Sequence, residues 1–161
     1  MNAQPPVDPA VVEARRQTLL SMWQEAREHG RLHEAHRASA TNMMLVLAAA
    51  GIGAAATLPL GTGTVPLALG LILLGAFGFL LSAKHHERWK RTLAVAVEFE
   101  NRIDALDPGL GLRASKDRAH EAHDQEHARW ARIRLNQVWS LLHVFVMLIG
   151  VVVLIASVVR M

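Results

Sequence analysis

The chain has 161 residues; 52% of them are hydrophobic, 5% are aromatic and 19% are charged, and the mean hydropathy is +0.21. A soluble globular domain seldom combines so positive a hydropathy with so few charges. Cysteine is absent, which excludes disulfides, thiolate nucleophiles, iron–sulfur clusters and zinc sites with sulfur ligands. The net charge of +3 is small, so we expect no nucleic-acid partner.

The N-terminal segment, 1–41, is predicted to be helical and to lie outside a membrane. Asp8 followed by Pro9 is a helix-start signal, because a carboxylate caps free N–H groups and proline fits the first helical turn. An imperfect amphipathic pattern follows, with Gly30 as an expected weak point. The apolar region of a secretory signal would lie near residues 10–20, where this chain is mostly polar, so we expect the N-terminus to be retained.

Three apolar runs are long enough to cross a bilayer core, which takes about 20 helical residues. They occupy 42–60, 64–83 and 138–159, within two stretches that contain no charged residue. Two prolines and two glycines within 59–66 break the helix between the first two runs. We therefore expect a tight transmembrane hairpin over 42–83 and a third transmembrane helix within 138–161.

The polar segment 84–137 is predicted to form two helices. The first continues from the second span to Leu106, where Asp107-Pro108-Gly109 stops it. The second runs from about Ser115 without Pro or Gly to Ile149, and so should lead directly into the third span. The expected fold is all-α, an integral membrane protein with three transmembrane helices and a cytoplasmic antiparallel helical stalk over 84–137.

The distribution of Lys and Arg predicts the orientation of these spans. Five lie before the first span, none in the hairpin turn, eleven between the second and third spans, and one at Arg160. By the positive-inside rule the N-terminus and the 84–137 segment are cytoplasmic, and the C-terminus is outside. Trp89, Trp130 and Trp139 fall at or near the predicted inner boundary, where aromatic rings favour the headgroup region. A bacterial inner membrane is the expected location.

Nine histidines are a high count for this length, and most of them are clustered. His29, His33 and His36 are spaced i, i+4, i+7, and His120, His123 and His127 are spaced i, i+3, i+7, so each set covers an arc of about 60° on a helix. Together with His85 and His86 they could form a zinc or other divalent metal site, since imidazole is a common metal ligand. The alternative is a set of solvated stalk histidines with no cofactor. Clustered histidines also predict a response to pH near neutrality.

His143 lies inside the third predicted span, where an ionisable residue usually faces the protein interior. It could pair with His85 or His86 to hold a haem through two imidazoles. The alternative is a neutral histidine that is hydrogen-bonded to Ser140 or to a neighbouring helix.

Small residues are dense in the first two spans and predict close helix packing, within one chain or between copies. The candidate packing residues are Ala49, Gly51, Gly53, Ala55, Gly70, Gly75 and Gly78. No ring of charged residues lines a span, so a selective ion pathway is poorly supported. No nucleophilic triad, phosphate-binding loop or pair of catalytic carboxylates is recognisable, and we expect the protein not to be an enzyme.

The local sequence His86-Glu87-Arg88-Trp89 leaves the second span and continues into Arg91, Thr92 and Glu98. With the preceding helix and hairpin, this pattern over residues 10–106 resembles the SLATT group of small bacterial membrane effectors. The resemblance implies a role in bacterial defence, in which a nucleotide-sensing partner triggers membrane disruption by the spans. The third span lies outside this two-span pattern.

Three functions are therefore expected as alternatives. The first is an oligomeric inner-membrane effector or pore-forming protein, in which the stalk acts as sensor or partner dock. The second is a non-catalytic subunit or scaffold of a larger membrane complex. The third is a metal or haem protein that uses the histidines. Membrane lipid is the expected partner in all three cases.

Overall fold

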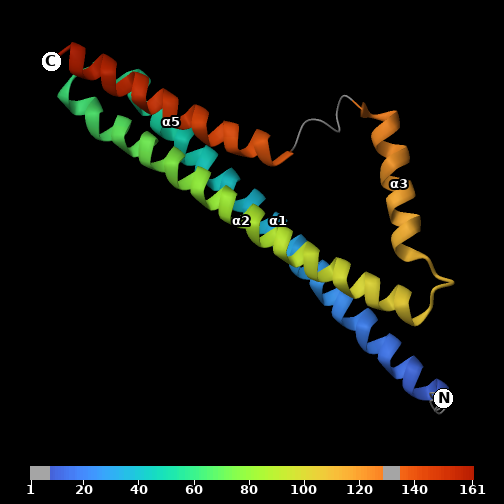
Figure 1. The fold of residues 1–161 in the computed structure, drawn as a ribbon. Helices are drawn as coiled ribbons and strands as arrows, with labels where there is room; N and C mark the ends of the chain where they lie inside the picture. Colours follow the sequence, from blue (N-terminus) through green and yellow to red (C-terminus); the bar gives the residue numbers. More distant parts are fainter. Residues whose placement is uncertain (1–7, 129–134) are drawn as a thin grey trace, which may run out of the picture. The chain divides into compact units, whose positions relative to one another are not determined.

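The computed structural model describes residues 8–128 and 135–161, and over these residues the chain forms α-helices and one short 3₁₀ turn (Figure 1). The elements are α1 (Pro9–Thr57), η1 (Thr62–Thr64), α2 (Val65–Leu106), α3 (Leu112–Glu126) and α5 (Leu135–Val159). Three of the helices contain a stretch that is long and apolar enough to span a membrane. The predicted all-α fold and its three candidate spans are confirmed.

The described chain forms two compact units. The polar unit consists of residues 8–32 and 89–128, and the apolar unit consists of residues 33–88 and 135–161. The unit boundaries lie outside the predicted span limits at residues 42 and 83, so the last polar turns before the hairpin pack within the apolar unit. We call this end of the apolar unit its polar end, and the end that contains η1 its turn end.

The start of α1 follows the capping signal in the sequence. Oδ1 of Asp8 accepts a hydrogen bond from the backbone N–H of Ala10 at 2.9 Å, as an N-cap carboxylate does. Gly30, the expected weak point, does not interrupt the helix. A side chain at Gly30 would lie 3.9 Å from the Trp89 indole of α2, so this position is packed within the polar unit. Packing thus outweighs the low helix propensity of glycine here.

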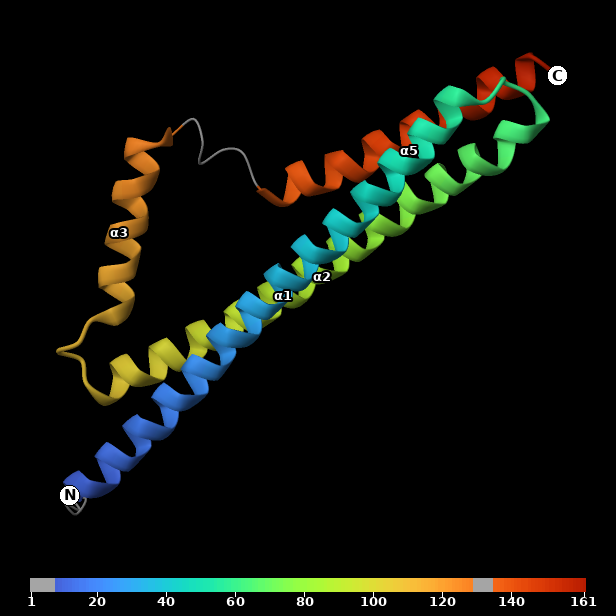
Figure 2. The same ribbon diagram turned by 180° about the vertical axis from the view of Figure 1, so that it is seen from behind.

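The apolar unit is a bundle of the α1–α2 hairpin and α5, which lies alongside the hairpin (Figure 2). Ala48, Leu71 and Val146 from the three helices form its buried core. At the turn end, the hydroxyls of Thr64 and Ser157 are 2.6 Å apart and buried. Large apolar side chains such as Leu73, Phe145 and Val152 point away from the bundle and are exposed, as lipid-facing residues would be.

In the polar unit, the segment of α2 after Trp89 packs antiparallel against the first part of α1. The indole N–H of Trp23 donates a hydrogen bond to Glu100 at 3.1 Å, and Ile103 is almost fully buried. α3 is held to α2 mainly through its first turns, where the Asp104 carboxylate accepts the backbone N–H groups of Leu112 and Arg113. The main antiparallel partner of 84–106 is therefore α1, whereas the sequence predicted the helix that begins near Ser115.

The second helix of the predicted stalk ends earlier than expected. No residue of α3 is buried, so tertiary packing does not support the helix beyond its first turns. It ends at Glu126, and the backbone of His127 leaves the helical conformation with φ −117° and ψ 37°. The predicted uninterrupted helix from Ser115 into the third span is thus wrong at His127. Trp130, which was predicted at the inner boundary, lies outside the described residues.

Candidate functional site

A polar cluster is buried at the polar end of the apolar unit. His143 of α5 is 2% exposed, and a Cβ atom at Gly78 of α2 would lie only 2.6 Å from its ring carbon Cε1. Thr41 and Ser82 are equally buried and line the same enclosed space. The inward position predicted for His143 therefore agrees with its place in the bundle. The space does not admit a water molecule, so a haem has no room between His143 and His85.

Arg37 is the charged member of this cluster, and it was not predicted from the sequence as a site residue. Its side chain is buried, with 8% of the residue exposed, and the guanidinium lies 5.8 Å from the centre of the Trp139 ring. No carboxylate pairs with Arg37 among residues 8–128 and 135–161. The signal was present in the helical spacing, because Arg37, Thr41, Met44 and Ala48 are buried at i, i+4, i+7 and i+11 on one face of α1.

His85 of α2 lies beside Arg37, and its ring centroid is 6.2 Å from that of His33 on α1. Burial lowers the pKa of His85 below its usual value, and electrostatic interaction with the basic side chains of His33, His36, Arg88 and Arg37 lowers it further. Both effects favour the neutral form of the imidazole. Its Nδ1 atom is buried and has no hydrogen-bond partner in the described part of the chain.

Further buried polar atoms at this end lack partners within the described chain. They are the hydroxyl oxygen of Ser82 and the indole nitrogen Nε1 of Trp139, and the amide oxygen Oδ1 of Asn136, near the start of α5, is a third. Buried polar groups are normally hydrogen-bonded, and those that are not often mark a bound group or a functional site. The polar end therefore combines an unpaired guanidinium with four polar atoms that have no partner within the described chain.

The predicted histidine metal site is not assembled in the part of the chain that the structure describes, where no three His, Asp or Glu side chains gather as metal ligands do. Instead the rings form pairs: His33 faces His85, and His123 contacts His127 edge-on at 4.7 Å between ring centroids. The remaining members of the predicted set, His29, His36, His86 and His120, join neither pair. Of these, His86 is half-buried and the others are exposed.

The predicted packing residues divide into two groups. A side chain at Gly75 would meet the backbone of α5 at 2.7 Å, a side chain at Gly51 would lie 3.1 Å from Leu71, and Gly78 faces His143, so these three are used within one chain. Ala55 is also buried. In contrast, Ala49 is exposed, and Gly53 and Gly70 have no atom near the position of a side chain.

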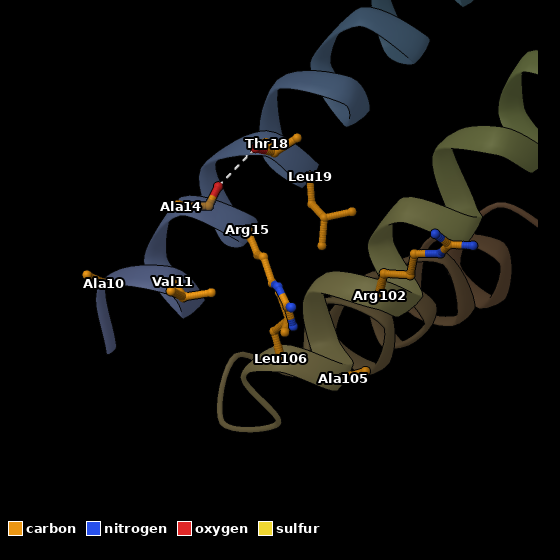
Figure 3. A pocket seen from close by; sticks show the side chains of 9 residues that line it. All are labelled: Ala10, Val11, Ala14, Arg15, Thr18, Leu19, Arg102, Ala105 and Leu106. Atoms are coloured by element: carbon orange, nitrogen blue, oxygen red, sulfur yellow. Dashed lines mark hydrogen bonds between the residues drawn. The ribbon is translucent and has the colours of Figure 1, made fainter. Parts of the chain in front are cut away.

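The polar unit contains an open apolar groove of about 760 Å³ between the first turns of α1 and the last turns of α2 (Figure 3). Val11, Leu19 and Leu106 supply its larger apolar side chains. The Arg15 side chain extends toward Leu106 and forms no ion pair with any described residue (Figure 3). Arg102, on the other wall, is paired with Glu98 at 2.9 Å.

A buried carboxylate links the three helices of the polar unit. Glu100 of α2 is 6% exposed and accepts hydrogen bonds from Trp23 of α1 at 3.1 Å and from Lys116 of α3 at 2.7 Å. Burial alone would raise the pKa of Glu100, but the hydrogen bonds from Lys116 and Trp23 lower it below its usual value. The ionised carboxylate therefore ties α3 to the helical pair.

No family model, no curated protein and no solved structure matches the chain. We therefore infer the function from the geometry of the two units.

Proposed function

We propose that the protein acts by assembly in a membrane and not by catalysis, as an oligomeric inner-membrane effector. The observation that carries the proposal is an open strip of small side chains on α1. Ala49, Gly53 and Ala56 are exposed at i, i+4 and i+7, while Gly51, Gly75 and Gly78 are covered within the chain. We call Ala49, Gly53 and Ala56 the α1 strip.

In lipid, helices associate through close van der Waals packing, because lipid tails are as apolar as the side chains themselves. A small-residue surface allows two backbones to approach closely, and the covered glycines show that this chain uses that packing internally. The α1 strip has the same chemistry but no partner within the described apolar unit. A second copy of the chain is the partner that we propose.

The polar unit is proposed to lie in the cytoplasm, by the excess of Lys and Arg before the first span and between the second and third. Its apolar groove would then act as a sensor or partner dock. The resemblance of residues 10–106 to the SLATT group supports an effector that disrupts the membrane in bacterial antiphage defence.

The alternative is a non-catalytic scaffold of a larger membrane complex. The groove favours it, because its apolar residues Val11, Leu19 and Leu106 are open to a partner. In that case the groove would be occupied in the complex and self-association would be unnecessary.

The mass of the full chain in mild detergent tests self-association, and light scattering should give a discrete homo-oligomer. Gly53→Leu should lower this mass, since it fills the α1 strip. The matched control is Val152→Leu, which enlarges an exposed side chain on α5 that lies between the exposed large side chains of Leu148 and Ile155. A monomeric wild type, or equal masses for wild type and Gly53→Leu, would contradict the proposed assembly.

Membrane disruption is measured separately, as dye release from vesicles that contain the purified protein. Wild type should release dye, Gly53→Leu should release markedly less, and Val152→Leu should match wild type. If the oligomer releases no dye at any ratio of protein to lipid, disruption of the membrane by the protein alone is excluded. That result would favour the scaffold function.

A further inference from the structure

The geometry points to a phospholipid-binding site at the polar end of the apolar unit, where Arg37, Trp139 and His85 bind the phosphate of an anionic lipid headgroup. The inference rests on membrane insertion as proposed above, but it does not depend on self-association or on membrane disruption.

The first step is the charge of Arg37. A guanidinium stays protonated in proteins, and burying it without a counter-charge is expensive even after the protein relaxes. Arg37 is 8% exposed and has no carboxylate partner in the described chain. The Trp139 face at 5.8 Å offsets only part of this cost, since a cation–π contact is weaker than the lost hydration of a buried charge. An anion from outside the chain would supply the missing counter-charge and offset the remaining cost of burying the guanidinium.

The nearby acidic residues do not neutralise this end. Glu87 is paired with Lys84, and Glu34 is exposed and forms no ion pair with Arg37, although it lies three residues before it. α5 contributes no acidic residue to the apolar unit. The groups that act on His85 from the surrounding helices are His33, His36, Arg88 and Arg37, and all of these are basic. The local field therefore favours an anion.

The second step is the set of hydrogen-bond donors. Arg37 carries five N–H groups, the Trp139 indole carries one, and a neutral imidazole such as that of His85 carries one on either nitrogen. Nε1 of Trp139 and Nδ1 of His85 are buried without partners in the described chain. Phosphate oxygens accept such donors, and arginine matches their geometry with two parallel bonds.

The third step distinguishes a lipid from a small anion held inside the bundle. The space behind Arg37, lined by Thr41, Ser82 and His143, does not admit a water molecule. An anion must therefore approach from the rim, where His33, His85 and Trp139 are each half-buried. The buried Nδ1 of His85 and Nε1 of Trp139 reach it when these side chains turn toward the rim. The rim lies at the boundary between charged and uncharged sequence, at the depth where lipid phosphates sit. Basic pockets between helices at this depth are suited to anionic headgroups.

The test uses the purified full chain in mild detergent and measures its melting temperature with added phosphatidylglycerol, phosphatidylcholine or inorganic phosphate at equal concentration. We expect phosphatidylglycerol to raise Tm by on the order of 5 °C. The other two should have little effect. Equal shifts with phosphatidylglycerol and phosphatidylcholine would overturn the site, and an equal shift with inorganic phosphate would overturn its assignment to a lipid.

Variants locate the effect. Arg37→Gln should weaken phosphatidylglycerol binding about tenfold, because it removes a charge-assisted contact. Arg31→Gln is the matched control, since it removes the same charge from the same helix at an exposed residue that pairs with Glu28. If Arg37→Gln binds as wild type does, the proposal is wrong.

Trp139→Phe keeps the aromatic face and removes only the N–H donor, so it reports on the site even if Arg37→Gln fails to fold. Native mass spectrometry should show less phosphatidylglycerol retained on Trp139→Phe than on wild type. Unchanged retention would exclude the indole N–H from the site. A monomer that still binds phosphatidylglycerol selectively would overturn the oligomeric function and leave this site intact.

Discussion

The imidazole of His143 occupies the space that a side chain at Gly78 would fill. A Cβ atom there would lie 2.6 Å from ring carbon Cε1 and 2.9 Å from Cγ, well inside van der Waals contact. Only glycine therefore allows α2 and α5 to approach at this level of the bundle, and the polar ring is held between the two helices.

Gly78→Ala should destabilise the apolar unit, because either the ring or the helix must shift. Overpacking of this kind costs about 1–3 kcal/mol. The measurement is thermal unfolding in detergent, followed by the loss of helical circular dichroism. Gly70→Ala is the matched control, since nothing lies within 4 Å of its side-chain position. Equal unfolding temperatures for the two variants would show that the close approach at Gly78 is not required.

The hydrogen bond between Thr64 and Ser157 should stabilise the turn end. It joins η1 to the end of α5 over 2.6 Å, and Ser157 is fully buried. Ser157→Ala should lower the free energy of unfolding by about 1 kcal/mol, which is typical for one such bond. A double-mutant cycle with Thr64→Ala separates this bond from the contacts of Thr64 with Gly61. Additive effects of the two substitutions would mean that the hydroxyls do not couple.

The helices themselves could be predicted from the sequence, because their signals are local. The stretches without charge set the three spans, and the prolines and glycines of 59–66 set the hairpin turn. The Asp8 cap likewise depends on adjacent residues only. Gly30 was misjudged because its helix is supported by Trp89, which lies 59 positions along the chain.

The polar cluster could be predicted only in part. Helical periodicity shows that Arg37 shares a face with Thr41, but it does not show which helix covers that face. Which small residues are covered within the chain and which are open also depends on how the helices pack. The position of α5 decides that Gly75 is covered and Gly70 is open. The end of α3 at Glu126 also escaped prediction, because a long run without breakers still needs packing to remain helical.

The Lys116 ammonium should control the titration of Glu100. Without it, burial would act with less opposition, so Lys116→Met should raise the pKa of Glu100 and loosen α3. Amide hydrogen exchange should become faster in residues 112–126, while Lys90→Met, which changes an exposed lysine on α2, should leave these rates unchanged. Unaltered exchange in Lys116→Met would show that Asp104 alone holds α3.

The same carboxylate predicts an acid limit for the polar unit. The pKa of Glu100 is lower in the folded chain than its usual 4.5, so its ionised form favours folding. This stability is complete above pH 4.5 and is lost as the pH falls through the lower folded value. In wild type, exchange of α3 should therefore increase below about pH 4.5. Glu100→Gln should reduce that dependence, and an identical acid profile in the variant would assign it to other groups.

His85 should make the apolar unit sensitive to a higher pH range. Its pKa in the folded chain lies below the ordinary 6.5, so the unfolded chain binds a proton first as the pH falls. Stability should therefore decrease from about pH 6.5 downward until the folded chain also binds the proton. We expect Tm of wild type to fall between about pH 7 and pH 5.5.

His85→Gln should flatten this part of the profile, while His29→Gln, at an exposed position in the polar unit, should not. Parallel profiles for all three proteins would contradict the role of His85, whose partly buried ring lies near basic side chains of α1 and α2.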